Sequence, residues 1–135
     1  MTAATEYDSR YLKGVLLFNR AEYFEAHEVW EDLWHETAGP ERRFIQGLIQ
    51  AAVCVYHASN GNALGSRRLF HSGRRYMSGF AARHLGMDAE YFWNMMEQAL
   101  AEFLFDQSVR VATLQVEFIP KIALLPEPHF WPEDT

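Results

Sequence analysis

The sequence EYFEAHEVWEDLWHE, residues 22–36, decides the fold that we predict for the rest of the chain. At 3.6 residues per turn, His27, Glu31 and Trp34 fall within about 60° of one another, on the side that carries most of the aromatic residues. The other acidic residues point toward solvent. Burying an unpaired charge is costly, so His27 and Glu31 should be paired, liganded or catalytic. The stretch therefore predicts a packed helix over about 22–37 with a polar site on its inner side.

A second long helix is predicted directly after the first one. Gly39 suits the position that follows a helix, and Pro40 suits the first turn of the next. The helix predicted over about 40–59 is apolar nearly all round, which is typical of a central, buried helix. Gly47 would let a neighbouring helix approach closely. Because the connection is short, we expect the two helices to be antiparallel neighbours.

Polar side chains should gather where these two helices face one another. Folding the hairpin at Gly39 places Gln46 and Gln50 opposite the His27–Glu31 pair, with His57 about 9 Å further along the axis. The side chains of the expected polar site are those of His27, Glu31, Trp34, Gln46, Gln50 and His57.

Helical spacing continues on both sides of this hairpin. It predicts further helices over about 7–19 and 63–85, and from an Asp88 cap to about 105. Four of the five prolines lie beyond residue 107, together with a β-favouring segment, which favours an extended arm. The predicted fold is all-α: a compact bundle of four to five helices over about 7–106, with an extended C-terminal arm over about 107–135, in one domain spanning 1–135.

Composition narrows the class of protein. A chain of 135 residues, 49% hydrophobic, is long enough to bury a core without cross-links. The single Cys54 excludes an internal disulfide and a cysteine-based zinc cage. We expect a cytoplasmic protein without a membrane span, because the N-terminus lacks a signal-peptide pattern and no apolar run is long enough to cross a bilayer. A formal charge of −6 argues against nucleic acid as a partner.

Three interpretations of the His27–Glu31 pair remain open. An imidazole and a carboxylate one turn apart can chelate a divalent metal, and a second helix commonly completes such a site in a bundle. The pair could instead be a general base with its orienting carboxylate. It could also be a buried hydrogen-bond network with Gln46 and Gln50 that sets the packing of the helices. Zinc needs three or four protein ligands, and only His27 and Glu31 are clear candidates.

Sequence motifs do not assign a reaction. The chain has no HExxH, no pair of Glu-x-x-His repeats, no glycine-rich phosphate loop and no nucleophile elbow. Whether the protein is an enzyme is therefore left open, with a small molecule as one candidate ligand.

A basic helix face is the second candidate site. It could hold an anion, be simply solvated, or contact the acidic outer face of the 22–36 helix in another subunit, which favours a homo-oligomer. The candidate anion-binding residues are Arg67, Arg68, His71, Arg74 and Arg75.

The central hairpin also resembles a known family. Its residues are the motif His27-x-x-x-Glu31-x-x-Trp34 with Phe24-Glu25-Ala26 before it, then FIQGLIQAA at 44–52, Tyr56-His57 and Gly61-Asn62. Over about 11–69 they are similar to the all-helical prokaryotic family called domain of unknown function 309. That resemblance implies a small closed helical bundle and metal binding by the motif His and Glu, and it implies no established reaction.

Two function hypotheses follow. In the first, a divalent metal on His27 and Glu31 activates water for hydrolysis of a small molecule. In the second, the protein is a non-catalytic structural or interaction module, and the polar site is only a buried hydrogen-bond network.

Overall fold

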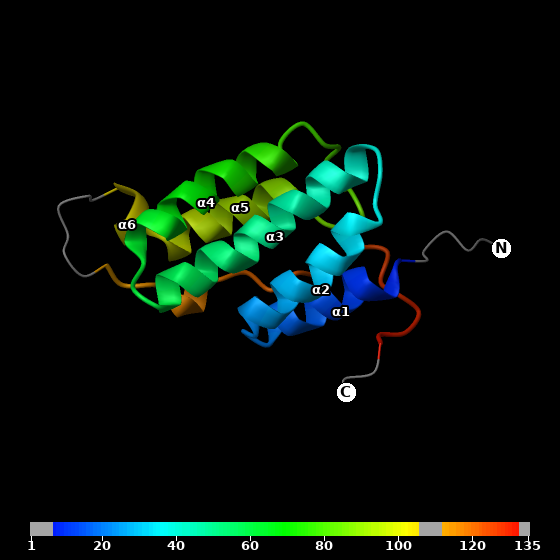
Figure 1. Cartoon of the computed structure of the whole chain (residues 1–135), viewed down its shortest axis with the longest axis horizontal. Coiled ribbons are helices and arrows are strands. Elements are labelled where there is room, and N and C mark those ends of the chain that lie inside the picture. Colours follow the sequence, from blue (N-terminus) through cyan, green and yellow to red (C-terminus); the bar gives the residue numbers. More distant parts are fainter. Residues whose placement is uncertain (1–6, 106–111, 133–135) are drawn as a thin grey trace.

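The structure is a computed structural model that describes residues 7–105 and 112–132 (Figure 1). In these two ranges the chain forms α-helices and one short 3-10 turn, which confirms the all-α prediction. No helix in the described part is long and apolar enough to cross a membrane. The elements are α1 (Ser9–Asn19), α2 (Tyr23–His35), α3 (Pro40–Ser59), α4 (Ala63–Met77), α5 (Ala89–Ala99), α6 (Ala101–Phe105) and η1 (Val116–Phe118).

Local sequence signals start three of the helices. The Asp8 side chain accepts the backbone N–H of Arg10 at 2.8 Å, and Asn62 and Asp88 cap α4 and α5 in the same way. Burial alone would raise the pKa of Asp8, but the hydrogen bonds and charge of Arg10 outweigh it and hold that pKa below its usual value. The α2–α3 turn follows the prediction, since Gly39 has a φ of 73° and Pro40 begins α3.

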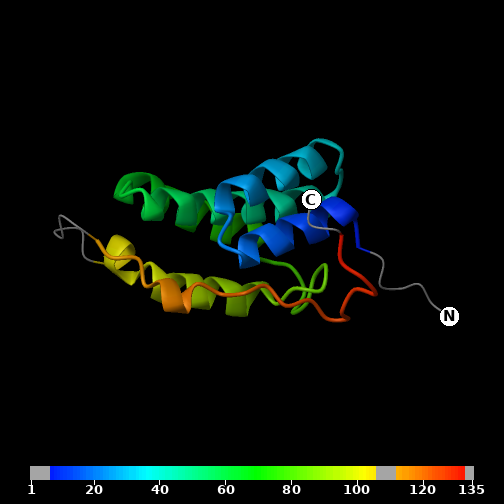
Figure 2. The same cartoon turned by 90° about the horizontal axis from the view of Figure 1, so that it is seen from below.

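The helices pack around α3. Figure 1 shows α3 running between α2 and α4, and α1 packs on the other side of α2. Figure 2 shows α5 on the far side of this layer, below α1 and α4. Large side chains fill the space between the layers, and Trp30, Phe44 and Trp93 are among those with 2% or less of their surface exposed. Their burial is the main source of stability for the fold.

Two predicted helix boundaries differ from the structure. The helix expected over 63–85 ends at Met77, because the chain turns away through Gly79, which has a φ of 86°. The helix expected to reach about 105 is interrupted at Leu100, which ends α5 with a φ of −106° before α6 begins. The described ranges therefore hold six α-helices instead of four to five. The expected start of the arm at 107 lies outside the described residues.

Residues 112–132 form an arm along the bundle. In Figure 2 it runs beside α5 and then returns toward α1. The Asn19 side chain donates to the carbonyl of Ile122 at 3.0 Å and accepts the Ile122 N–H at 2.7 Å. The side chains of Ile122 and Leu124 are buried in the core, and Tyr7 donates to the carbonyl of Pro126. The described part of the arm is extended apart from η1, in agreement with the prediction.

Candidate functional site

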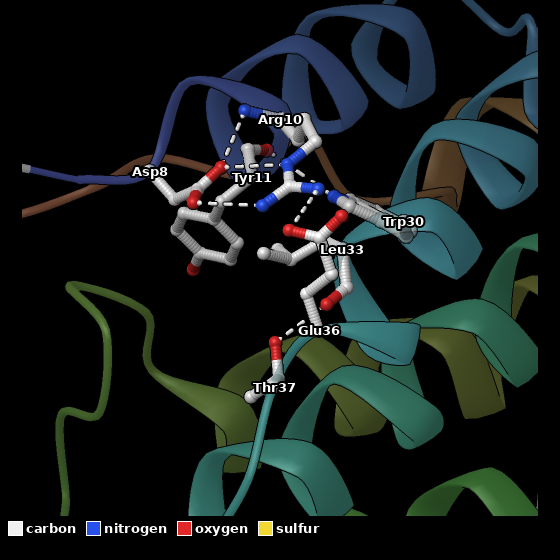
Figure 3. Close-up of polar contacts among 7 residues, drawn as sticks. All are labelled: Asp8, Arg10, Tyr11, Trp30, Leu33, Glu36 and Thr37. Carbon is white, nitrogen blue, oxygen red and sulfur yellow. Dashed lines mark hydrogen bonds and ion pairs between the residues drawn. The ribbon is translucent and has the colours of Figure 1, made fainter.

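The orientation of α2 decides which of its residues can form a site. Its buried residues are Ala26, Trp30 and Leu33, with Trp30 fully buried. Contacts with α1 hold α2 in this orientation, as Figure 3 shows. The Trp30 indole donates to the carbonyl of Tyr11 at 3.2 Å, and Arg10 forms an ion pair with Glu36 at 3.2 Å.

This orientation corrects the predicted buried pair. Glu31 is exposed and His27 is half-buried, so the expectation that both lie inside the bundle is wrong. The physical reason is the position of Trp30, which occupies the centre of the core face. Because successive helical residues are 100° apart, a buried Trp30 turns Glu31 toward the surface. The motif residues therefore lie at the edge of the buried face of α2 or outside it, instead of at its centre.

His27 is held by its own helix. Its Nδ1 lies 3.0 Å from the carbonyl oxygen of Phe24, and its ring contacts the Phe24 ring with centroids 5.1 Å apart. A carbonyl oxygen only accepts, so Nδ1 carries the proton of this hydrogen bond. In the neutral imidazole, Nε2 is then the nitrogen with the lone pair.

The glutamine helix faces a different neighbour from the one we predicted. The predicted close approach at Gly47 is real, but the neighbour is α4: a β carbon at Gly47 would lie 2.9 Å from the carbonyl oxygen of Gly73. The β carbon of Gln50 also lies against Gly73. The expectation that Gln50 faces the His27–Glu31 pair is therefore wrong. Its Oε1 is buried and has no hydrogen-bond partner among the described residues.

The six predicted site residues do not converge. Gln46 and Trp34 line one cleft at the α2–α3 turn. His57 lies at the opposite end of α3, where its Nδ1 is 3.4 Å from the side-chain nitrogen of Asn62. Tyr56, beside it, contacts Phe24. The motif thus spans two separate regions at the two ends of the hairpin.

The donor set does not fit a metal held by this chain. Among residues 7–105 and 112–132 there is no group of three or more His, Cys, Asp or Glu side chains that could hold a metal ion. A protein zinc site needs at least three ligands, and an exposed Glu31 beside a half-buried His27 supplies at most two.

The basic face of α4 is divided between two roles. Arg67 donates to the carbonyl of Phe103 at 3.0 Å, and Arg74 forms an ion pair with Glu97 at 2.7 Å and a hydrogen bond with Asn94. These two arginines hold α5 and α6 against α4. The other three predicted anion-binding residues are exposed: Arg68, His71 and Arg75.

Two exposed stripes with the same spacing emerge from this geometry, and the sequence reasoning missed their match. The acidic stripe on α2 consists of Phe24, Glu28, Glu31 and His35. The basic stripe on α4 consists of Leu64, Arg68, His71 and Arg75. All eight residues are exposed, and both stripes follow the i, i+4, i+7, i+11 spacing of one helix face. The signal was present in the sequence, but it was hidden by the assignment of Glu31 to the core.

More acidic side chains lie beside the acidic stripe. A groove of about 690 Å³ between α1 and α2 is lined in part by Lys13, Leu17 and Val29. Its carboxylates are those of Glu22, Glu25, Glu28, Glu31 and Asp32.

Comparison with known proteins agrees with the motif. Residues 11–69 match the family described as domain of unknown function (DUF309). The resemblance to this family is thereby confirmed. The DUF309 match covers α1, α2, α3 and the first turns of α4, so it includes the acidic stripe and begins the basic one.

A relative in a bacterium extends the comparison. The chain is 32% identical over 95 residues to "Uncharacterized protein YpuF" of Bacillus subtilis (strain 168), which is 67% of this chain and 55% of that protein. The chain thus spans about half the length of this relative. Neither the family description nor the relative's name states an activity.

Proposed function

We propose that this protein is a non-catalytic interaction module that associates with a second copy of itself, the acidic stripe of one copy meeting the basic stripe of the other. The observation that carries the proposal is the exposure of Glu31 within a stripe whose spacing matches that of α4. An acidic motif residue that points into solvent, with like charges beside it, is better suited to recognising a cationic surface than to binding a metal.

The first three positions of the two stripes are complementary, whereas the fourth sets His35 against Arg75. In a parallel alignment, Phe24 meets Leu64, Glu28 meets Arg68, and Glu31 meets His71. Because both stripes use the same intervals, these three contacts are about 6 and 4.5 Å apart along each helix axis. Each copy carries both stripes, so a two-fold dimer would form this contact twice.

The apolar ends of the stripes supply the anchors. Phe24 is 43% exposed and Leu64 is 53% exposed. The Phe24 ring lies against Tyr56, with centroids 5.2 Å apart, which keeps it in place on the surface. Binding energy at protein interfaces is concentrated in such fixed apolar residues, whereas an exposed ion pair contributes less than about 1 kcal/mol. The charges would mainly select the partner and its register.

The stripes are placed for contact between molecules. Within one chain, α2 and α4 each pack on α3, and Figure 1 shows them on either side of it. The acidic stripe of α2 and the basic stripe of α4 are therefore both available for contact with a partner molecule. A heterologous protein with a basic helix is the competing occupant.

The metal-dependent hydrolytic alternative has one supporting observation. The hydrogen bond to Phe24 leaves Nε2 of His27 as the lone-pair nitrogen, which is the arrangement that metal-binding histidines use. The metal site that this alternative requires lacks a buried carboxylate and, among the described residues, a third ligand. Elemental analysis of protein purified without a histidine tag decides between the two hypotheses. One bound metal per chain, with a lower melting temperature after chelation, would favour the hydrolytic function.

Sedimentation velocity over a range of protein concentrations tests the self-association. We expect a monomer–dimer equilibrium that shifts toward monomer as salt is raised, since exposed charges are screened beyond about 10 Å at 0.1 M salt. Phe24→Ser should shift it toward monomer at every salt concentration. A monomer at all concentrations in low salt would overturn the proposal, and a heterologous basic partner would then be the remaining occupant.

A further inference from the structure

A cleft at the α2–α3 turn has the chemistry of an anion site, and nothing in the self-association proposal uses it. It has a volume of about 410 Å³ and is open to solvent. Its lining residues lie where α2 ends, α3 begins and α4 ends, and Figure 1 shows these helix ends at the same end of the bundle. The residues around it are Trp34, Gly39, Arg42, Arg43, Gln46 and Tyr76.

Arg42 is fixed in the wall of this cleft. The Cζ of its guanidinium lies 3.7 Å from the centroid of the Trp34 ring. Its Nη1 donates to the carbonyls of Trp34 and Thr37, each at 3.3 Å, and so satisfies the C-terminal end of α2. Stacking and capping together hold one guanidinium nitrogen and leave Nε and Nη2 for another acceptor.

Arg43 repeats this arrangement on the other side. Its Cζ lies 4.9 Å from the centroid of the Tyr76 ring, and its Nη2 donates to the carbonyl of Arg75 at 3.2 Å. The contact caps the end of α4 as Arg42 caps the end of α2. Two consecutive arginines therefore carry their charges on two aromatic rings at one cleft.

Arg42 and Arg43 form no ion pair within the described residues. The ion pairs of Arg10, Arg74 and His84 lie elsewhere. The neighbouring acid, Glu41, lies 3.5 Å from Nε2 of His84. In a chain with a formal charge of −6, such a cleft is a distinct site for negative charge.

We infer that this cleft binds a small oxyanion group, a phosphate or a carboxylate, between the two guanidiniums. A guanidinium presents its N–H groups as a fork that matches two oxygens of one such group, and fixing it beforehand reduces the entropy lost on binding. The Gln46 amide in the cleft provides a further donor. Trp34, the last residue of the motif, is then a positioning residue that acts through Arg42.

Titration of 15N-labelled protein with inorganic phosphate and, separately, with acetate tests the inference. We expect binding in the millimolar range, with shifts confined to the side-chain N–H signals of Arg42, Arg43 and Gln46. Arg43→Gln should weaken binding at least about tenfold, since it removes charge-assisted hydrogen bonds. Gln46→Leu is a second, neutral variant at a half-exposed position, and it should weaken binding with the fold kept.

Arg83→Gln is the matched control. It removes the same charge from an exposed position outside the cleft and outside the two stripes, so it should leave anion binding unchanged. Binding of phosphate alone would identify a phosphate group as the ligand, and binding of acetate alone a carboxylate. No saturable shift with either ion, or binding that Arg43→Gln leaves unchanged, would overturn the inference without affecting the self-association proposal.

Discussion

Gly14 of α1 and Trp30 of α2 are in direct contact, and a β carbon at Gly14 would fall on the Trp30 indole. The absent side chain lets the indole reach the carbonyl of Tyr11. Burial of Trp30 then turns the acidic stripe outward. The stripe therefore depends on a glycine in the neighbouring helix.

The first prediction concerns this contact. Gly14→Ala should lower the free energy of unfolding by about 3 kcal/mol, because the added methyl overpacks a fully buried site. Urea unfolding followed by circular dichroism measures the change. Ser9→Ala, at an exposed position of the same helix, should shift the midpoint little. Equal stability of Gly14→Ala and wild type would contradict the described packing of α1 on α2.

A second prediction separates the two polar motif residues by their stability effects. Glu31→Gln should change the free energy of unfolding by no more than about 0.5 kcal/mol, since the side chain is exposed. His27→Ala should cost about 1 kcal/mol, through loss of the hydrogen bond to Phe24 and of the ring contact. A loss of several kcal/mol for Glu31→Gln would restore the buried pair that the sequence suggested.

A third prediction concerns the single cysteine. Cys54 is fully buried, and its thiol donates to the carbonyl of Ser66 at 3.2 Å. Burial raises the pKa of the Cys54 thiol to about 12, although the Ser66 hydroxyl, 3.4 Å from the sulfur, acts in the other direction. The reactive thiolate is therefore absent from the native protein at pH 8. A thiol reagent should label Cys54 only after denaturation, and labelling of the native protein as fast as in urea would refute this.

The buried thiol also makes the stability of the protein depend on pH. The raised pKa means that the native state keeps a proton that the unfolded chain releases above about pH 9. The stabilising effect of the protonated thiol is complete below that pH and is lost as pH rises toward 12. Cys54→Ala should remove this part of the alkaline loss of stability, which pH-dependent unfolding curves can show.

The arm gives a fourth prediction. Asn19 makes two hydrogen bonds with Ile122, so Asn19→Ala should loosen the arm and cost about 1–3 kcal/mol. Limited proteolysis should then cut the arm faster than in wild type. Asn19→Asp keeps the acceptor for the Ile122 N–H but sets a carboxylate oxygen against the Ile122 carbonyl, so it should also be cut faster than wild type. No difference among the three proteins would show that Asn19 does not hold the arm.

The sequence was sufficient to predict the helical hairpin, but it did not show which faces of the two helices are buried. Gly39 and Pro40 gave the turn, and helical spacing gave α2 and α3 to within about two residues. The inner side of α2 was misjudged, because aromatic residues lie around most of that helix and Phe24 remains exposed. α3 is apolar nearly all round, so the pattern of its sequence did not indicate that Gly47 and Gln50 face α4.

The candidate site shows the same limit. Spacing placed Trp34 and Gln46 near one another, and the structure brings them into one cleft. Arg42, which stacks on Trp34, was not among the predicted site residues. Stacking on an aromatic ring depends on the angle between two helices, which single-sequence periodicity does not contain.

The central claim is that the acidic stripe of α2 meets the basic stripe of α4 in a second copy. Its most direct test uses two charge-reversed proteins, one with Glu28→Arg and Glu31→Arg, the other with Arg68→Glu and His71→Glu. All four positions are exposed, so both proteins should fold, and Glu117→Arg serves as a control reversal away from the stripes.

Sedimentation velocity of the two reversed proteins, alone and mixed in equal amounts, is the decisive measurement. Each protein alone should be monomeric, because like charges now face one another. The mixture should form dimers at least as well as wild type, since each reversed stripe then meets its complement, and Glu117→Arg should behave as wild type. Dimers of either reversed protein alone, or a mixture that stays monomeric while wild type dimerises, would contradict the claim.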